Sequence, residues 1–178
     1  MRIISGKFRG KKIEAPLELP VRPTTDFAKT GLFNILSFQK NLASCTVLDL
    51  YSGTGNITYE FISRGVKDIT SVDYHKGCTA FIISTLKKLN ADNSQVITSD
   101  ALEWLENCHQ QYDIIFADPP YENSPVKELV NIIFSNHLLK TDGLLIIEHR
   151  SNMKPVTNPE ADETRKYGAV AFSIFASK

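Results

Sequence analysis

The chain has 178 residues and a mass of 19.9 kDa, enough for one domain with its own core. Hydrophobic residues make up 42% and charged residues 22%, which excludes a disordered, collagenous or coiled-coil chain. No apolar stretch approaches the roughly 20 residues that cross a bilayer, and the first residues lack a signal peptide's apolar core. Cys45, Cys78 and Cys108 form neither a disulfide framework nor a paired metal motif, so we expect a reduced, cytoplasmic protein.

The net charge of zero hides an uneven distribution of charge along the chain. The first 40 residues carry eight Lys or Arg against three Asp or Glu, which leaves +5, so the rest of the chain carries −5. Such a difference between segments indicates an anionic partner for the basic end. The alternative is a solvated strand whose lysines protect its edge from pairing with other chains.

The first part of the chain has the pattern of a small structured extension. Residues 1–23 are rich in glycine and proline, which predicts a small β-hairpin or an extended arm. Polar residues at 24–26 can cap a helix, and the apolar residues that follow recur at helical spacing until about Phe38. We therefore expect a basic, RNA-contacting extension of hairpin plus helix over 1–40 and a second domain over 41–178.

From residue 46 onward, short apolar strands alternate with helices, which predicts an α/β fold with a doubly wound, mostly parallel, Rossmann-like sheet. The last strand is reached without a crossover helix, so we expect it to pair antiparallel with its neighbour. The expected strands are 46–50, 69–72, 95–98, 112–117, 144–148 and 169–175. The expected helices run from the loop at 53–55 to about 64, and over 76–90, 101–109 and 125–138, and a polar loop covers 151–164.

The first candidate site is the D-x-x-x-G-x-G motif of Asp49, Gly53 and Gly55, between a predicted strand and a predicted helix. Ligands of doubly wound sheets bind at the carboxyl ends of the strands, where glycines let the backbone come close. A dinucleotide site prefers a third glycine where this chain has Thr58. The acid at the strand end instead suits an amino group, which Asp49 could bind directly or through water. A plain strand-to-helix turn is the alternative.

Two further acids follow later strands of the predicted sheet. Asp73 lies 20 residues after Gly53, the spacing at which a carboxylate accepts the ribose hydroxyls of a bound nucleoside. Asp100 follows the third strand and could accept the N6 amine of an adenine. Taken alone, Asp73 could instead be a solvent-exposed helix cap.

The most specific motif is Asp118-Pro119-Pro120-Tyr121, directly after the apolar strand at 112–117. Two prolines stiffen the backbone and remove two N–H donors, which leaves carbonyl acceptors beside a carboxylate. This set suits an exocyclic amine on a planar group, because such an amine offers two N–H donors. The ring of Tyr121 can stack on the same planar group. A rigid turn that closes the strand is the alternative.

Together these motifs resemble a class I S-adenosylmethionine-dependent methyltransferase with a D-P-P-Y motif. The stretches RIISGKFRGKKI, RPTTD and LFNIL, and RKYG near the end, resemble more narrowly the RsmD family of bacterial 16S ribosomal RNA guanine-N2 methyltransferases, over nearly the whole chain. The resemblance implies methyl transfer from S-adenosylmethionine to the N2 amine of a guanine flipped into the D-P-P-Y pocket.

The resemblance also implies roles for particular residues. The expected catalytic residues are Asp118, Pro119, Pro120 and Tyr121. The expected cofactor-binding residues are Asp49, Tyr51, Gly53, Gly55, Asp73, Asp100 and Ala101. The expected RNA-binding residues are Arg2, Lys7, Arg9, Lys11, Lys12 and Arg22. The expected partner is ribosomal RNA or an assembly intermediate of the small subunit, bound by a monomer without a metal ion or a membrane.

The chain departs from the family pattern after RPTT. The family commonly continues D-R-V-R-E, whereas residues 26–30 read DFAKT, so Lys29 keeps one basic charge while Phe27 and Thr30 replace an Arg and a Glu. The family also often ends the D-P-P-Y motif with Phe, where this chain has Tyr121.

Three other interpretations remain open. Another amino-methyltransferase could use the same motif, but a protein-glutamine enzyme more often has Asn at position 118, and a DNA-adenine enzyme usually carries a recognition domain for which 178 residues leave little space. A non-catalytic RNA-binding module and a nicotinamide dehydrogenase belong to other classes. The complete set of motifs argues against both.

Overall fold

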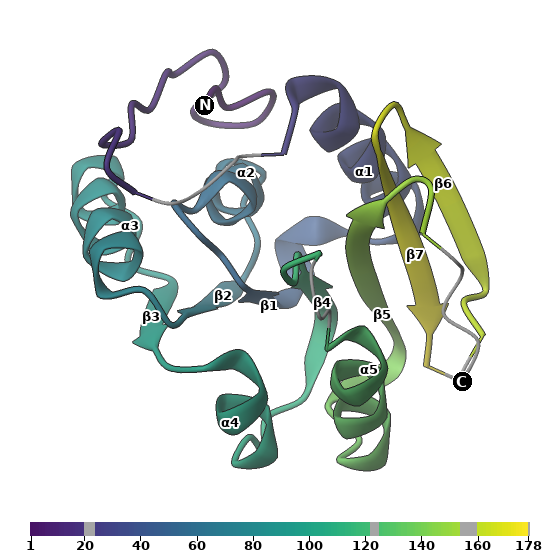
Figure 1. The fold of residues 1–178 in the computed structure, drawn as a ribbon. Coiled ribbons are helices and arrows are strands. Elements are labelled where there is room, and N and C mark those ends of the chain that lie inside the picture. Colours follow the sequence, from purple (N-terminus) through teal and green to yellow (C-terminus); the bar gives the residue numbers. More distant parts are fainter. Residues whose placement is uncertain (20–23, 122–124, 154–159, 178) are drawn as a thin grey trace.

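The computed structural model describes residues 1–19, 24–121, 125–153 and 160–177 (Figure 1). The strands are β1 (Thr46–Leu50), β2 (Asp68–Asp73), β3 (Ser94–Thr98), β4 (Tyr112–Ala117), β5 (Leu139–Arg150), β6 (Glu163–Tyr167) and β7 (Val170–Ala176). The helices are α1 (Asp26–Gln39), α2 (Asn56–Ser63), α3 (Lys76–Leu89), α4 (Ala101–Glu106) and α5 (Val126–Ser135), with a short 3₁₀ turn at Leu42–Ser44. Within these described ranges, no helix is both long and apolar enough to cross a membrane.

The strands form one sheet in the order β3-β2-β1-β4-β5-β7-β6. β1 pairs in parallel with β2 and β4, β2 with β3, and β4 with β5, while β7 pairs antiparallel with β5 and β6. The chain reverses its direction of winding between β1 and β4, so the carboxyl ends of these two strands form the switch point where ligands bind. The prediction of a doubly wound, mostly parallel sheet with an antiparallel last strand is confirmed.

Two details of the sheet differ from the sequence prediction. β6 lies at 163–167, partly within the expected loop at 151–164. Its sequence is polar and has no apolar alternation, and its pairing with β7 makes it a strand. β5 begins at Leu139 rather than 144, because its pairing with β4 continues through a bulge. Residues 140–143 have a turn-like sequence, which gives no sign of this strand.

Helices cover both faces of the sheet (Figure 1). α1, α2 and α3 pack on one face around a buried cluster that includes Leu32, Phe61 and Ile82. α4 and α5 pack on the other face around a second cluster that includes Leu105 and Leu129. The carboxyl edge of the sheet lies between these two layers of helices.

The N-terminal segment forms the expected hairpin and packs on the first helix layer. Arg2 and Lys12 form an antiparallel bridge, and the Ile3 N–H donates to the Lys11 carbonyl at 3.0 Å. Ile3 and Ile13 are buried in the same cluster as α1, α2 and α3. The hairpin therefore shares the hydrophobic core of the sheet instead of standing apart from it.

Polar contacts attach this hairpin to α2 through the buried Glu60. Its carboxylate accepts hydrogen bonds from the backbone N–H groups of Ile4 and Ser5 at 2.8 and 3.1 Å. It also lies 3.6 Å from the buried Lys29 Nζ of α1 and 3.0 Å from Arg64 Nε. Burial lowers the pKa of Lys29, and Glu60 opposes this shift. One carboxylate thus joins the hairpin, α1 and α2.

Gly6 and Gly10 provide a matched test of this docking. Both have φ +82°, but a Cβ on Gly6 would lie 1.9 Å from the Ser63 carbonyl oxygen, whereas a Cβ on Gly10 meets no atom within 4 Å. Gly10→Ala should cost about 1–2 kcal/mol of the free energy of unfolding, from backbone strain alone. Gly6→Ala should cost about 3 kcal/mol or more, because helix backbone cannot move aside. Urea unfolding of both variants checks this, and equal losses would show that the docking contact contributes nothing.

Candidate active site

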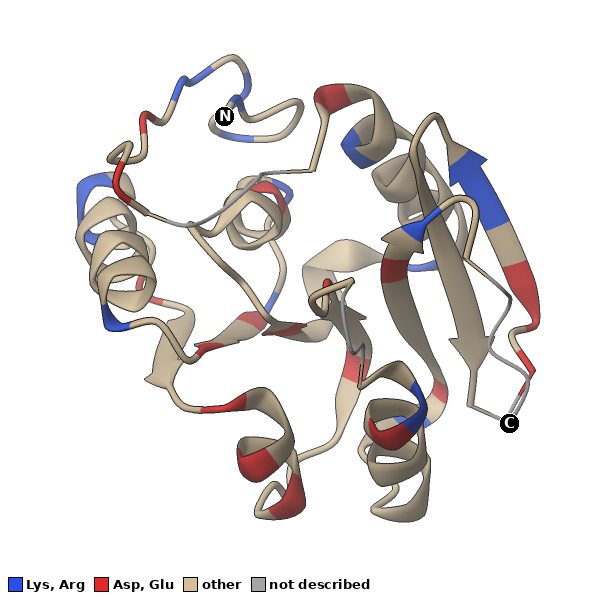
Figure 2. Ribbon diagram, viewed as in Figure 1, with Lys and Arg blue, Asp and Glu red and all other residues tan. Residues whose placement is uncertain are grey.

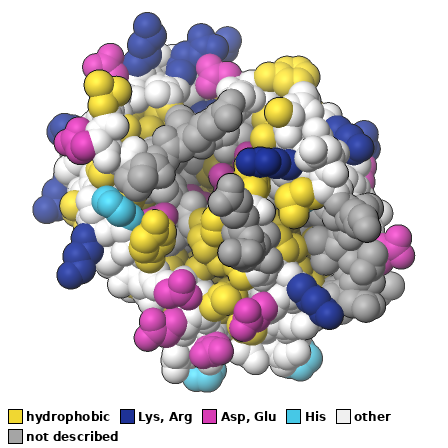
Figure 3. Space-filling model, in the orientation of Figure 1, with side chains coloured by type: hydrophobic (Ala, Val, Ile, Leu, Met, Phe, Trp, Pro, Cys, Tyr) yellow, Lys and Arg dark blue, Asp and Glu magenta, His cyan; other side chains and the backbone are white. Residues whose placement is uncertain are grey.

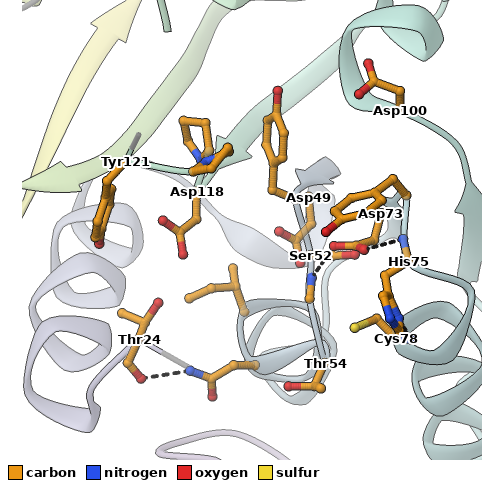
Figure 4. Close-up of a pocket in the computed structure, with 17 residues that line it drawn as sticks. Thr24, Asp49, Ser52, Thr54, Asp73, His75, Cys78, Asp100, Asp118 and Tyr121 are labelled. Atoms are coloured by element: carbon orange, nitrogen blue, oxygen red, sulfur yellow. Dashed lines mark hydrogen bonds between the residues drawn. The ribbon is translucent and has the colours of Figure 1, made fainter. Parts of the chain in front are cut away.

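A cavity of about 570 Å³ opens at the carboxyl edge of the sheet (Figure 4). This volume is in the range of about 300–1,000 Å³ that is typical of small-molecule sites. The loop after β1, the end of β2 and residues 118–121 after β4 line it, together with Thr24. Of the expected site residues, Asp49, Tyr51, Gly53, Asp73, Asp100 and all four residues of the D-P-P-Y motif lie on its wall.

Gly55 and Ala101 have structural explanations that need no ligand. Gly55 precedes α2 with φ +83°, and a Cβ there would lie 2.7 Å from the Tyr59 ring, so the start of this helix requires glycine. Ala101 is buried at the first position of α4. Neither is among the residues that line the cavity.

Asp73 holds the loop after β1 in place. Its carboxylate accepts hydrogen bonds from the Gly53 and His75 backbone N–H groups, each at 2.8 Å (Figure 4). Each carboxylate oxygen has a second lone pair, so these bonds leave acceptor capacity for a ligand. Asp100 caps α4 by accepting from the N–H groups of Leu102 and Glu103 at 2.9 and 3.2 Å. Both acids are therefore structural, and both still line the cavity.

Asp49 is a buried acid in the middle of this wall. It is 1% exposed, and its Oδ2 accepts a hydrogen bond from the Thr58 hydroxyl at 2.5 Å. Burial raises its pKa to about 7, although the Thr58 hydrogen bond opposes the shift. Thr58, which replaces the third glycine of a dinucleotide motif, thus has a function of its own as the partner of Asp49.

The D-P-P-Y motif directs a carboxylate and an aromatic ring into the same space. Figure 4 shows Asp118 and Tyr121 pointing into the cavity from the loop after β4, with Asp49 beside Asp118. The Arg150 guanidinium lies 5.1 Å from the centre of the Tyr121 ring. Burial raises the pKa of Asp118 well above its ordinary value, and the charges of Glu148 and Asp49 add to the shift.

The sequence motifs did not point to Glu148 or to the position of Thr24. Glu148, near the end of β5, is 2% exposed and accepts a hydrogen bond from the Thr24 hydroxyl at 2.8 Å. Burial raises its pKa to about 7. Thr25 rather than Thr24 caps α1, and Asn56 Nδ2 donates to the Thr24 carbonyl at 2.9 Å. One sequence feature could have identified Glu148, because it is an acid near the end of an apolar strand, as Asp49 is.

The expected RNA-binding cations gather on one end of the molecule (Figures 2 and 3). Arg2, Lys7, Arg9, Lys11 and Lys12 are all exposed on the hairpin, although Arg2 pairs with Asp26 at 3.1 Å. Arg22 lies outside the described residues. At the opposite end, α4 carries the acids Glu103 and Glu106, whereas α5 carries both a cation and an acid, Lys127 and Glu128 (Figure 2).

Comparisons with known proteins agree with this arrangement. A family model described as Conserved hypothetical protein 95 matches residues 1–176. The Ribosomal RNA small subunit methyltransferase D of Buchnera aphidicola is 31% identical over 159 residues, covering 89% of this chain and 81% of that protein. The protein of the same name from Escherichia coli K12 is 32% identical over 148 residues, which cover 83% of this chain and 74% of that protein. The solved structure of Escherichia coli yhhF, a candidate methyltransferase, has a TM-score of 0.85 at 28% identity and covers 100% of this chain and 98% of its own.

The fold and the acids at its switch point define a class I S-adenosylmethionine-dependent methyltransferase. The chain belongs to the family whose model it matches, the RsmD family, and the resemblance inferred from its motifs is confirmed.

The raised pKa of Asp49 makes the stability of the free protein depend on pH. Between about pH 4 and pH 7 the unfolded chain ionises this acid while the folded chain keeps it protonated, so folding stability is lost as the pH rises. Asp49→Asn keeps an acceptor for Thr58 and removes the titration. Relative to this variant, the wild type should lose up to about 4 kcal/mol of its free energy of unfolding as the pH rises from 4 to 8. Urea unfolding at each pH measures the difference, and parallel pH curves would contradict the assignment.

Proposed function

We propose that this protein transfers a methyl group from S-adenosylmethionine to the N2 amine of a guanine in 16S ribosomal RNA. The observation that carries the proposal is the D-P-P-Y motif, whose carboxylate and ring point into the same cavity as Asp49 and Asp73 (Figure 4). The names of the relatives support an RNA of the small ribosomal subunit as the substrate.

The cavity wall offers groups that fit the cofactor. Asp73 would accept the ribose hydroxyls, Asp49 would bind the ammonium group directly or through water, and Asp100 would accept the adenine N6 amine, with Tyr51 and Gly53 beside them. Several acids on one wall also suit a ligand that carries positive charge. When bound, the cofactor supplies a methyl group on a sulfonium, which is already electrophilic without a metal ion.

The chain's own contribution is alignment and electrostatic stabilisation. The lone pair of guanine N2 is delocalised into the ring. When Asp118 and the Pro119 carbonyl accept hydrogen bonds from the two N–H groups of this amine, they favour a pyramidal nitrogen and localise the lone pair on it. Tyr121 stacks on the base, and Pro120 stiffens the turn that holds these groups. The N2–methyl bond forms as the methyl–sulfur bond breaks, the bonding pair stays on sulfur, and N2 then loses a proton.

The charge on the surface gives the RNA a direction of approach. The exposed cations of the hairpin attract phosphate, whereas the acids of α4 repel it (Figures 2 and 3). We assign RNA contact to residues 1–40, of which Thr24 also lines the cavity, and methyl transfer to residues 41–178, within one chain that acts as a cytoplasmic monomer.

The direct test is methyl transfer by the Asp118→Ala variant. Labelled cofactor and small-subunit RNA should give N2-methylguanine with the wild type. The variant should be slower by about 10²-fold or more, because it loses a charge-assisted acceptor at the reacting atom. Cofactor affinity, measured by calorimetry, should change only several-fold, and Asp68→Ala, at the exposed amino end of β2, serves as the control. Label in DNA adenine or protein glutamine would favour another amino-methyltransferase, and an equal loss of cofactor affinity would reassign Asp118.

The hairpin is tested by neutralising Lys7, Arg9, Lys11 and Lys12 together to Gln. RNA affinity should fall, and the slope of log affinity against log salt should decrease by about 0.7–0.9 for each lost phosphate contact. Cofactor affinity should not change, because the cavity is built from later parts of the chain. Filter-binding titrations at several salt concentrations measure the slope.

A matched variant neutralises four exposed cations outside the hairpin, namely Lys67, Lys87, Lys88 and Lys127. It should keep the salt slope of the wild type. If the two variants behave alike, the hairpin lysines only protect an edge from aggregation.

A further inference from the structure

The ends of β4 and β5 bring a second carboxylate to Asp118. These parallel strands pair Phe116 with Ile146 and Ala117 with Ile147, so Asp118 and Glu148 follow at the same level. Phe116 and Ile146 lie in the same core cluster, and side chains two residues apart point to the same face of a sheet. The two acids therefore project side by side from neighbouring strands, which lie about 4.8 Å apart.

The surroundings of Glu148 leave it few partners. It is buried at 2% exposure, β7 flanks it through its paired residue Phe172, and the Thr24 hydroxyl donates to its Oε2 at 2.8 Å. Among the described residues, the charged groups that act on Asp118 are two acids, Glu148 and Asp49 on β1. The buried cation of α1, Lys29, binds the Arg2 carbonyl, Asn56 and Glu60 instead.

We propose that Glu148 is a positioning residue of the methyl transfer, which forms with Asp118 a carboxyl pair that takes up the proton lost by the target amine. This inference rests on the proposed function. As the N2–carbon bond forms and the carbon–sulfur pair stays on sulfur, the proton leaves N2 for an ionised oxygen of Asp118. It returns to water when the products leave.

The physical reason is the strength of Asp118 as a base. An isolated surface aspartate is a poor proton acceptor at neutral pH, whereas a base works best when its pKa lies near the working pH. Burial and the neighbouring charge of Glu148 raise the pKa of Asp118, and the pKa of Glu148 itself is raised to about 7. Thr24 fixes Glu148 in place by its hydrogen bond.

The test is Glu148→Gln, which keeps an oxygen that can accept from Thr24 and removes the charge. In protein labelled with ¹³C at aspartate carboxyls, and with Asp118→Asn to assign the signal, Asp118 should titrate at a lower pH in Glu148→Gln than in the wild type. This measurement needs neither RNA nor cofactor. In methyl transfer, kcat should fall about 10-fold or more, its acidic limb should move to lower pH, and KM for RNA and cofactor affinity should stay near wild type.

Two further variants make the result specific. Glu106→Gln, an exposed acid of α4, should leave both the titration and kcat unchanged. Thr24→Val removes only the hydroxyl, so it should raise the pKa of Glu148 and change the pH profile of kcat even if Glu148→Gln fails to fold.

The outcomes separate the two claims. An unchanged Asp118 titration in Glu148→Gln overturns the carboxyl pair, and a shifted titration with wild-type kcat overturns its part in proton uptake. For an unfolded Glu148→Gln, a Thr24→Val variant with the wild-type pH profile overturns the proposal. If the wild type transfers no methyl group to small-subunit RNA, the proposed function fails, and the titration still decides whether the pair exists.

Discussion

The parallel register of β2, β1, β4 and β5 is the constraint on which the site depends. Parallel strands end at the same edge of a sheet, so acids that are far apart in the sequence arrive together. Asp73, Asp49, Asp118 and Glu148 come from four neighbouring strands or from the residue that follows one. A different strand order would separate these acids, even with every motif intact.

Burying several carboxylates at one edge is unfavourable unless each finds partners. Backbone N–H groups satisfy Asp73, Thr58 donates to Asp49, and Thr24 donates to Glu148. These bonds only partly offset burial, and the pKa values of Asp49 and Glu148 stay raised at about 7. Acids whose pKa values lie near 7 ionise more fully when a cation binds beside them, which fits a sulfonium cofactor.

The hairpin and the cavity are connected through α1 and α2. Glu60 binds hairpin backbone and Lys29, Lys29 donates to Asn56, and Asn56 donates to the carbonyl of Thr24 on the cavity wall. Lys29 is the one position of the altered segment that keeps a basic charge, and the buried carboxylate of Glu60 beside it explains why a cation is needed there. The segment proposed to hold RNA is thus fixed relative to the segment proposed to hold the base.

The sequence by itself determined the α/β class, most of the strands and the acids of the three motifs, because short-range patterns and spacings encode them. It did not reveal β6, whose polar residues become a strand only by pairing with β7, or the extension of β5 through a bulge. The sequence pattern predicted a basic extension over residues 1–40, but it did not show that Glu60 attaches the hairpin to α2. Only the tertiary structure placed Glu148 beside Asp118, because residues 30 apart in sequence become neighbours through the pairing of β4 with β5, which no local pattern records.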